Sequence, residues 1–390
     1  MILSRRCAAE DPLNTIARTR AALEASGVQL LELSDSNPTR HDLLDPAVAD
    51  VLARTARTST CYDPDPRGPI VAREALAEYA GGSPDDYWLT PGTSAAYGWL
   101  FALLTDPGEQ VAIPQPGYPL LEPLARLAGT GLVRYPSYYL HPHGWEYDLD
   151  ALDRLAADPA TRAVVVVNPN NPTGAAADQA DALIELCCRQ DGCLVADEVF
   201  APFGLDAATG RTVDSPGIRR LAGTSSVLSF GLDGLSKLLA APHLKLGWIR
   251  LSGPRKDVAR VAPVLDRIAD AYLPASGPTA AALPDLLRLA PTSVARIGAR
   301  LRQNLATART LFTGPGYRVR RCDGGWTVLV DVPRVLPEDD VVLALLRRGI
   351  AVQPGWFFDL DSPGTLALSL LPADFAERCG LLKSTLDALG

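Results

Sequence analysis

From Trp88 onward, short apolar segments alternate with longer segments of helical periodicity. The predicted strands are residues 88–90, 111–113, 132–135, 163–167, 193–196, 227–230 and 246–250, with helical segments such as 95–104, 120–127 and 177–189 between most of them. Segments that are apolar throughout, such as the valines at 164–167, are typical of strands buried on both faces. The pattern therefore predicts an α/β protein whose large domain has a mostly parallel, seven-stranded sheet flanked by helices.

The character of the sequence changes after about residue 285. Residues 293–312 have the apolar stripe of a long amphipathic helix, and shorter predicted strands and helices follow it to a closing helix at 374–389. We interpret 47–285 as the large domain, 286–390 as a smaller α+β domain, and 1–46 as an N-terminal segment that packs with the small domain.

The composition limits the partners that the chain can have. Its 390 residues carry a formal net charge of −8, which argues against nucleic acid or an anionic membrane surface. The seven cysteines are irregularly spaced without a C-x-x-C pair, so we expect neither a disulfide framework nor a metal site. No apolar segment approaches the roughly 18–20 residues of a membrane-spanning helix, and the N-terminus lacks a secretory signal. We therefore expect a soluble cytoplasmic protein.

Polar groups with complementary chemistry follow four of the predicted strands. They are a helix start with backbone N–H groups (Gly92, Thr93, Ser94), an amide in a double-proline turn (Asn171), a carboxylate (Asp197) and a lysine (Lys237). In parallel α/β sheets, ligands bind beyond the carboxyl ends of the strands, so we expect these groups to share one pocket. A phosphate cradle, an amide, a carboxylate and an amine together predict a site for pyridoxal 5′-phosphate.

Each group has a specific part to play in such a site. The carboxylate keeps the pyridine nitrogen protonated, so that the ring can accept electrons from a substrate carbanion. The lysine holds the cofactor covalently and then moves a proton as general base and acid. The amide donates to the ring phenolate, and the helix start binds the phosphate. A helix cap, a turn residue and a buried salt-bridge partner are the structural alternatives for Gly92–Ser94, Asn171 and Asp197, respectively.

Three ordered motifs carry a resemblance to a known family. They are NPNNPTG at 168–174, DEVF at 197–200 and GLSKLLAAPHLKLGW at 234–248. With them, nearly the whole chain resembles fold-type I pyridoxal-phosphate enzymes of the class I/II aminotransferase group. The resemblance implies that Ser236 and Lys237 contact the cofactor and that Tyr118, in QPGYP, stacks on its ring. It also implies that Tyr62 reaches the phosphate of a neighbouring subunit, and hence a homodimer with a shared active site.

The chain departs from this family at four positions. Lys245 stands where the family usually has a phosphate-binding arginine, so the charge is kept but the bidentate fork is lost. Phe200 replaces a common tyrosine and removes a hydrogen bond to the ring phenolate. Gly234 replaces a phosphate-binding serine, with Asp233 beside it. Ala367 occupies the place of the arginine that grips a substrate carboxylate, a contact worth about 1.5–3 kcal/mol.

The missing arginine leaves the reaction open. Our candidates for substrate contacts are Asn37, Arg40, Arg67, Trp356 and Ala367. Either the substrate has no carboxylate at that place, or Arg40 or Arg67 replaces the lost cation, or the carboxylate is meant to leave.

Three functions follow from these observations. The first is an aminotransferase for an amino acid or small amine, and the second is a lyase or decarboxylase with the same cofactor. A nucleotide-binding oxidoreductase or a non-catalytic binding protein is the third, and the absence of a G-x-G-x-x-G motif after a strand speaks against its dinucleotide version.

Overall fold

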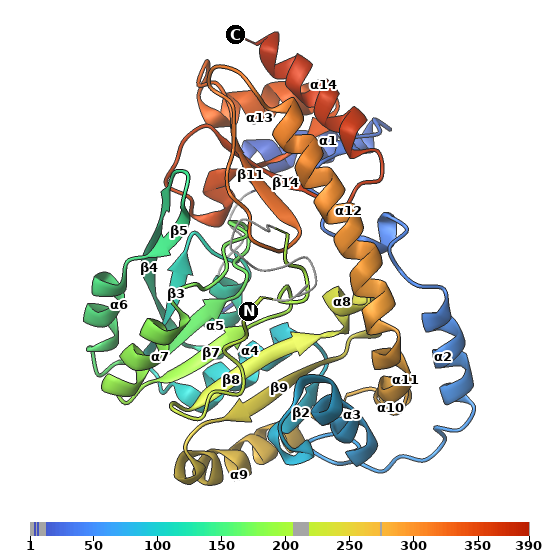
Figure 1. The fold of residues 1–390 in the computed structure, drawn as a ribbon, viewed down its shortest axis with the longest axis vertical. Coiled ribbons are helices and arrows are strands. Elements are labelled where there is room, and N and C mark those ends of the chain that lie inside the picture. The colour runs from blue at the N-terminus through green and yellow to red at the C-terminus, as the bar shows by residue number, and fades with distance from the viewer. Residues whose placement is uncertain (1–3, 5, 8–12, 206–217, 274, 390) are drawn as a thin grey trace.

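The computed structural model describes residues 4, 6–7, 13–205, 218–273 and 275–389. Its central feature is a sheet of eight described strands. They are β2 (Tyr87–Thr90), β3 (Gln110–Gln115), β4 (Gly131–Leu140), β5 (Gly144–Tyr147), β6 (Thr161–Val167), β7 (Cys193–Asp197), β8 (Ser229–Gly234) and β9 (Gly247–Ser252). Figure 1 shows this sheet in the lower half of the molecule, with helices on both of its faces.

The order of the strands is β2-β9-β8-β7-β6-β3-β4-β5. The pairs β3–β4, β3–β6, β6–β7 and β7–β8 are parallel, whereas β2–β9, β8–β9 and β4–β5 are antiparallel. The expected mostly parallel sheet is therefore confirmed, and all seven predicted strands are present. The eighth strand, β5, was missed because its sequence, GWEY, has no continuous apolar run, and it extends an edge of the sheet by a hairpin.

The central strands are buried on both faces, as their apolar sequences predict. One face is covered by α4 (Thr93–Leu104), α5 (Leu121–Ala128) and α9 (Arg255–Tyr272), and the other by α6 (Leu149–Ala156) and α7 (Ala180–Arg189). Along β6, Val165 packs into the first cluster, whereas Val164 and Val166 pack into the second. Successive side chains of a strand point to opposite faces, so a strand between two helical layers needs apolar residues throughout.

A second group of helices covers the β2–β9 end of the sheet. It consists of α2 (Ala47–Ala56), α3 (Ile70–Ala80), α10 (Gly277–Ala281) and α11 (Leu283–Arg288). Short 3-10 or helical turns complete this part of the chain: η1 (Pro38–Arg40), η2 (Pro84–Asp86), α8 (Leu235–Leu238) and η4 (Pro242–Leu244). Of these, α8 follows β8 directly and carries Lys237.

A smaller sheet lies above the carboxyl ends of β7 and β8 in Figure 1. Its order is β10 (Arg318–Val319), β11 (Thr327–Asp331), β14 (Thr365–Ser369) and β13 (Gln353–Pro354), all antiparallel. The helices α12 (Ala290–Leu311), α13 (Glu338–Arg347) and α14 (Phe375–Asp387) pack on it, and η5 (Gly355–Phe358) precedes β14.

The N-terminal segment is joined to this C-terminal part by backbone pairing. The strand β1 (Leu31–Glu32) is parallel to β12 (Ile350–Ala351), and α1 (Thr15–Ala25) contacts α13. The Ser369 N–H donates to the Leu33 carbonyl oxygen at 2.7 Å, which brings the residues after Leu33 to the end of β14.

No helix in the described parts of the chain combines the length and the apolar character that crossing a membrane requires. Within the same residues, His, Cys, Asp and Glu side chains form no group of three or more that could hold a metal ion.

Candidate active site

A cavity of about 320 Å³ lies where the carboxyl ends of β6, β7 and β8 meet the smaller sheet. Eight of the predicted site residues line it: Gly92, Thr93, Tyr118, Asn171, Asp197, Phe200, Ser236 and Lys237. Ser34 and Ser36 reach it from the N-terminal segment, and Trp326, Thr327, Gln353 and Ser369 reach it from the C-terminal part. The groups that follow four separate strands thus converge on one cavity, as the parallel sheet predicts.

Lys237 is held in an apolar, aromatic part of this cavity. Its Nζ atom lies 5.0 Å from the ring centroid of Trp326 and 5.5 Å from that of Phe200. Burial lowers the pKa of Lys237, and the negative charge of Asp197 opposes this shift. A lysine with a lowered pKa has a larger neutral fraction, which is the form that attacks a carbonyl carbon. Phe200, at the position where the resemblance leads one to expect a tyrosine, contacts Lys237 through the face of its ring.

Asp197 ends β7 and forms the acidic floor of the cavity. The Tyr97 hydroxyl donates to its Oδ2 atom at 3.0 Å, and the Val199 N–H donates to Oδ1 at 3.4 Å. Burial raises the pKa of Asp197 to about 6, against the lowering effect of these two hydrogen bonds. A cationic ring nitrogen is the partner that would compensate for this buried charge.

Tyr97 was missed by the sequence analysis. It lies on α4, four residues after Thr93, and its side chain is 1% exposed. The available signal was a single hydroxyl-bearing aromatic residue in the mostly apolar part of the helix that follows Thr93 and Ser94. A buried tyrosine hydroxyl usually has a hydrogen-bond partner. The partner itself could not be named from sequence, because Asp197 is 100 residues away along the chain.

Lys245 lies close to the start of α4. Gly92 is the N-cap residue with φ 125°, a conformation that favours glycine. The Lys245 Nζ atom lies 3.8 Å from the position that a Cβ atom at residue 92 would occupy. The amine thus reaches the helix start, where backbone N–H groups and the helix dipole already favour an anion. Ser94 lies one residue further into α4 and does not line the cavity.

Gly234 explains the absence of the usual serine. A Cβ atom at this position would lie 2.9 Å from both Gly247 Cα and the Leu246 carbonyl oxygen. Because strands β8 and β9 approach so closely here, this chain has no room for a side chain at residue 234.

Replacing Lys245 with alanine is expected to weaken pyridoxal phosphate binding by about tenfold, because a charge-assisted contact to the phosphate is lost. The dissociation constant is measured by titrating the cofactor into apoprotein and following absorbance. Lys256→Ala, which removes an exposed lysine at the start of α9, is the matched control and should leave the constant unchanged. Equal behaviour of the two variants would remove Lys245 from the phosphate site.

The three asparagines of the NPNNP turn make different contacts. Asn168 accepts the Ala177 N–H at 3.0 Å and donates to the Arg219 carbonyl oxygen at 2.8 Å. Asn170 bonds to Thr173 at 3.1 Å within the turn. Asn171 lines the cavity, so Asn168 and Asn170 stabilise the turn and its surroundings while the second of the adjacent pair, Asn171, lies at the cavity.

Tyr118 also lines the cavity. Burial, together with the charge of Asp197, raises the pKa of Tyr118 to about 12. The phenol is therefore neutral at physiological pH, and its ring is available for stacking.

Several predicted site residues lie outside the cavity of the single chain. Tyr62 is 72% exposed, and Arg40 is largely exposed beside Asp35 at 3.5 Å. The Asn37 side chain caps η1, where it accepts the Thr39 N–H at 3.2 Å. None of the three is among the residues that line the cavity.

Arg67, predicted as a substrate-binding residue, is not among the residues that line the cavity of the single chain. Its guanidinium makes two hydrogen bonds to the Asp266 carboxylate, at 2.7 and 2.8 Å, and lies over the Trp88 ring at 4.5 Å. Trp356 is likewise engaged elsewhere, because its Nε1–H donates to Asp339 at 2.7 Å. The neighbouring Phe357 and Phe358 line the cavity in its place.

Ala367 faces the junction of the two sheets but is covered by apolar side chains. It shares one face of β14 with Ser369, which lines the cavity. Leu329, Phe358 and Leu360 pack around it. Among the described residues that line the cavity, Lys237 is the only one with a cationic side chain. The place of the carboxylate-binding arginine is thus filled by an apolar cluster.

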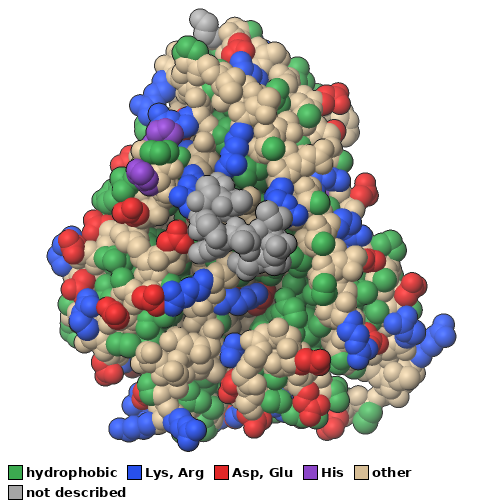
Figure 2. Space-filling model, in the orientation of Figure 1, with side chains coloured by type: hydrophobic (Ala, Val, Ile, Leu, Met, Phe, Trp, Pro, Cys, Tyr) green, Lys and Arg blue, Asp and Glu red, His purple; other side chains and the backbone are tan. Residues whose placement is uncertain are grey.

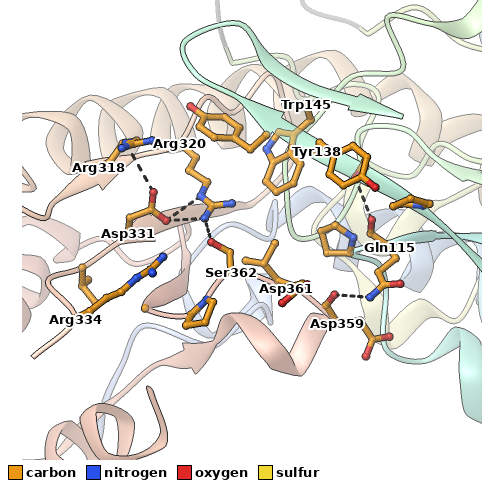
Figure 3. A pocket seen from close by; sticks show the side chains of 18 of the residues that line it. Gln115, Tyr138, Trp145, Arg318, Arg320, Asp331, Arg334, Asp359, Asp361 and Ser362 are labelled. Atoms are coloured by element: carbon orange, nitrogen blue, oxygen red, sulfur yellow. Dashed lines mark hydrogen bonds and ion pairs between the residues drawn. The ribbon is translucent and has the colours of Figure 1, made fainter. Parts of the chain in front are cut away.

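A larger cleft, of about 730 Å³, lies beside this cluster and carries none of the predicted chemistry. Figure 3 shows Arg320 in this cleft with its guanidinium directed to Asp331 and Ser362. Arg320 also donates to Thr365, on the same face of β14 as Ala367, at 3.0 Å. Because its hydrogen bonds are committed to these partners, Arg320 does not replace the arginine missing at residue 367.

The residues present fit pyridoxal phosphate. The helix start and Lys245 suit the phosphate, Asp197 suits the ring nitrogen, Asn171 suits the phenolate oxygen, and Lys237 suits the aldehyde carbon.

On the molecular surface, acidic and basic side chains are interspersed over the face shown in Figure 2.

Comparisons with known proteins agree with this chemistry. A family model described as aminotransferase class I and II matches residues 29–375. An alanine aminotransferase of Mycobacterium tuberculosis is 29% identical, over 90% of this chain and 84% of its own length. A glutamate-pyruvate aminotransferase of Haemophilus influenzae is 26% identical, over 90% and 88%.

Solved structures show the same fold. An alanine aminotransferase from Pyrococcus furiosus superposes with a TM-score of 0.86 at 21% identity, covering 99% of this chain and 100% of its own. An aspartate aminotransferase of Thermus thermophilus, a double mutant, gives a TM-score of 0.82 at 26% identity, with both chains covered completely.

Proposed function

The chain belongs to the class I and II aminotransferase family, and from this premise we propose that it transfers the amino group of an amino acid or small amine without an arginine grip on a carboxylate. The observation that carries the proposal is the pair of Lys237 and Asp197 in a cavity whose described lining has no second cation. Family membership makes the protein a pyridoxal-phosphate-dependent aminotransferase, and the atypical substrate pocket is the part that we add.

The side chains divide the chemical work among them. Bound pyridoxal phosphate supplies the electron sink that stabilises a substrate carbanion. Asp197 keeps a proton on the ring nitrogen, and Tyr118 holds the ring in place by stacking. The Lys237 amine takes a proton from the substrate carbon and returns it to the cofactor side of the reacting centre. Trp326 and Phe200 exclude water from this amine.

The substrate half of the cavity is neutral. Its polar side chains are Ser34, Ser36, Thr327, Gln353 and Ser369, and its apolar side chains include Leu120, Phe357 and Phe358. A carboxylate directed at the cluster around Ala367 would lose its hydration without gaining a charged partner, which is unfavourable. We therefore favour a substrate whose group directed at this cluster is small and uncharged. The relatives named as alanine aminotransferases are consistent with a substituent of this size.

A matched pair of amino donors tests this pocket. L-Norvaline and butylamine differ only by the carboxylate, and the formation of pyridoxamine phosphate reports amino-group transfer from either. Without a charged grip, kcat/KM for the two donors should agree within about tenfold, whereas a charge-assisted contact would favour norvaline by roughly 10- to 100-fold or more. A preference for norvaline clearly above tenfold would mean that another cation binds the carboxylate.

A lyase or decarboxylase is the second candidate, favoured by the same apolar surroundings of Ala367. A carboxylate that is weakly held can turn out of the ring plane and leave as carbon dioxide. Ammonia or carbon dioxide without stoichiometric pyridoxamine phosphate would support this candidate and contradict amino-group transfer as the main reaction.

We also propose that the active enzyme is a cytoplasmic homodimer. The exposed position of Tyr62, in a loop that resembles the family segment reaching a neighbouring phosphate, supports a shared site. A native mass of two chains is the expected result.

A further inference from the structure

A buried charge cluster lies behind the phosphate end of the cavity. The Arg220 guanidinium bridges Asp233, at 2.8 Å, and Glu198, at 3.5 Å. Both carboxylates are almost completely buried, and the Arg220 side chain is 29% exposed. The cluster joins the ends of β7 and β8 to residues 218–222.

The position of Asp233 creates an electrostatic problem for an anionic ligand. Asp233 immediately precedes Gly234, which lines the cavity with Gly92, Thr93 and Ser236. A bare carboxylate here would repel a phosphate bound at the start of α4. The charge of Asp233 is also felt at Asp197, because it raises the pKa of that carboxyl group.

The contacts of Asp233 also affect the backbone of the site. Its Oδ1 atom accepts the Gly234 N–H at 2.7 Å, while Oδ2 faces Arg220. Arg220 thereby fixes the carboxylate that orients the Gly234 peptide. Gly234 leads directly into α8, which carries Ser236 and Lys237.

Arg220 is itself fixed by its neighbours in the chain. The Leu221 N–H donates to Glu198 Oε1 at 2.5 Å, and the Arg219 carbonyl oxygen accepts from Asn168 at 2.8 Å. The segment that carries Arg220 is thus attached to β7 and to the NPNNP turn, both of which supply cavity residues.

We propose that Arg220 is a positioning residue that neutralises Asp233 and so makes the phosphate end of the cavity acceptable to a dianion. The inference rests on the pyridoxal phosphate site and adds a residue that does not touch the ligand. If Arg220 acts only by neutralising Asp233, then removing Arg220 should weaken ligand binding only while the Asp233 carboxylate is present.

Titrations of apoprotein with pyridoxal phosphate, and with pyridoxal as a ligand that lacks the phosphate, test this dependence. Arg220→Met should weaken pyridoxal phosphate binding by about tenfold or more, and pyridoxal binding by less than about threefold. Adding Asp233→Asn to Arg220→Met should restore pyridoxal phosphate binding to within about threefold of wild type. Thermal melting of each apoprotein checks that it is folded.

Two results would overturn the inference. One is an equal loss for the two ligands in Arg220→Met, and the other is a double variant no better than the single one. If Arg220→Met does not fold, Asp233→Asn alone decides, because removing the anion should leave pyridoxal phosphate binding as tight as in wild type or tighter. A tenfold loss in that variant would contradict neutralisation. Failure of amino-group transfer with normal titrations would instead contradict the proposed function.

Discussion

Alanine in place of Lys237 is expected to lower kcat/KM for amino-group transfer by about a thousandfold or more, because both the covalent hold on the cofactor and the proton transfer are lost. The structure gives the reason why no other group takes over. Lys237 is the only cationic side chain among the described residues that line the cavity, and Lys245 lies instead near Gly92 at the start of α4. The variant is assayed as holoprotein, with pyridoxamine phosphate formation as the readout.

Lys237→Arg is the matched control, because it keeps the positive charge but offers no amine nucleophile. It should be as inactive as the alanine variant. Borohydride treatment of the loaded wild type followed by peptide mapping should find the cofactor on Lys237. Turnover near the wild-type rate in either variant, or a label on a different lysine, would contradict the assignment.

The site residues that could be predicted from sequence are those that follow a buried strand. Asn171, Asp197 and Lys237 each stand within a few residues of an apolar segment, and the parallel sheet collects such positions at one edge. Local sequence thus determines their placement, because a strand that is apolar throughout must lie in the middle of the sheet. The central strands β6, β7 and β8 were predicted for the same reason.

The residues that escaped prediction depend on contacts between distant parts of the chain. Tyr97 bonds to Asp197 and Arg67 bonds to Asp266, 199 residues apart in the second case. The pairing of Arg67 could not be predicted, because a free arginine near a loop and one held in a bidentate pair have the same local sequence. Arg220 follows neither a strand nor a recognised motif, and only its contacts with Glu198 and Asp233 give it a place near the site.

The departures from the family pattern also acquire physical explanations. Phe200 and Trp326 surround Lys237 with ring faces, so the amine is tuned by burial rather than by a phenol. Gly234 is required by the approach of Gly247, and Asp233 beside it is paired with Arg220. These substitutions change the contacts around the proposed cofactor site. They leave Lys237 and Asp197 at the cavity.

Asparagine in place of Asp197 is expected to lower kcat/KM by about a hundredfold or more and yet to stabilise the apoprotein at pH 8. Asp197 is 5% exposed, and burial raises its pKa from 3.8 to about 6. Well below pH 3.8 the carboxyl group is protonated in both the folded and the unfolded chain, so its burial is not penalised. As the pH rises from 4 to 6, the unfolded chain loses this proton before the folded chain does, and the free energy of unfolding falls.

Above pH 6 the penalty is constant, at roughly 2–3 kcal/mol for a shift of this size. The neutral amide of Asp197→Asn avoids this free-energy penalty. For a chain of this length, the apoprotein of the variant should therefore melt about 3 °C higher than the wild type. The difference between variant and wild type should shrink steadily as the pH falls to 4, and Glu198, which titrates in both proteins, cancels from it.

Tyr97→Phe is the control that should act in the opposite direction. It removes the hydroxyl that donates to Asp197 at 3.0 Å, so the buried carboxylate becomes less stable and the apoprotein should melt at a lower temperature at pH 8. Melting curves of the three apoproteins between pH 4 and 8 measure both effects. An Asp197→Asn apoprotein that melts below wild type at pH 8 would mean that the carboxylate stabilises the empty fold, and that it is not kept there for the sake of the cofactor alone.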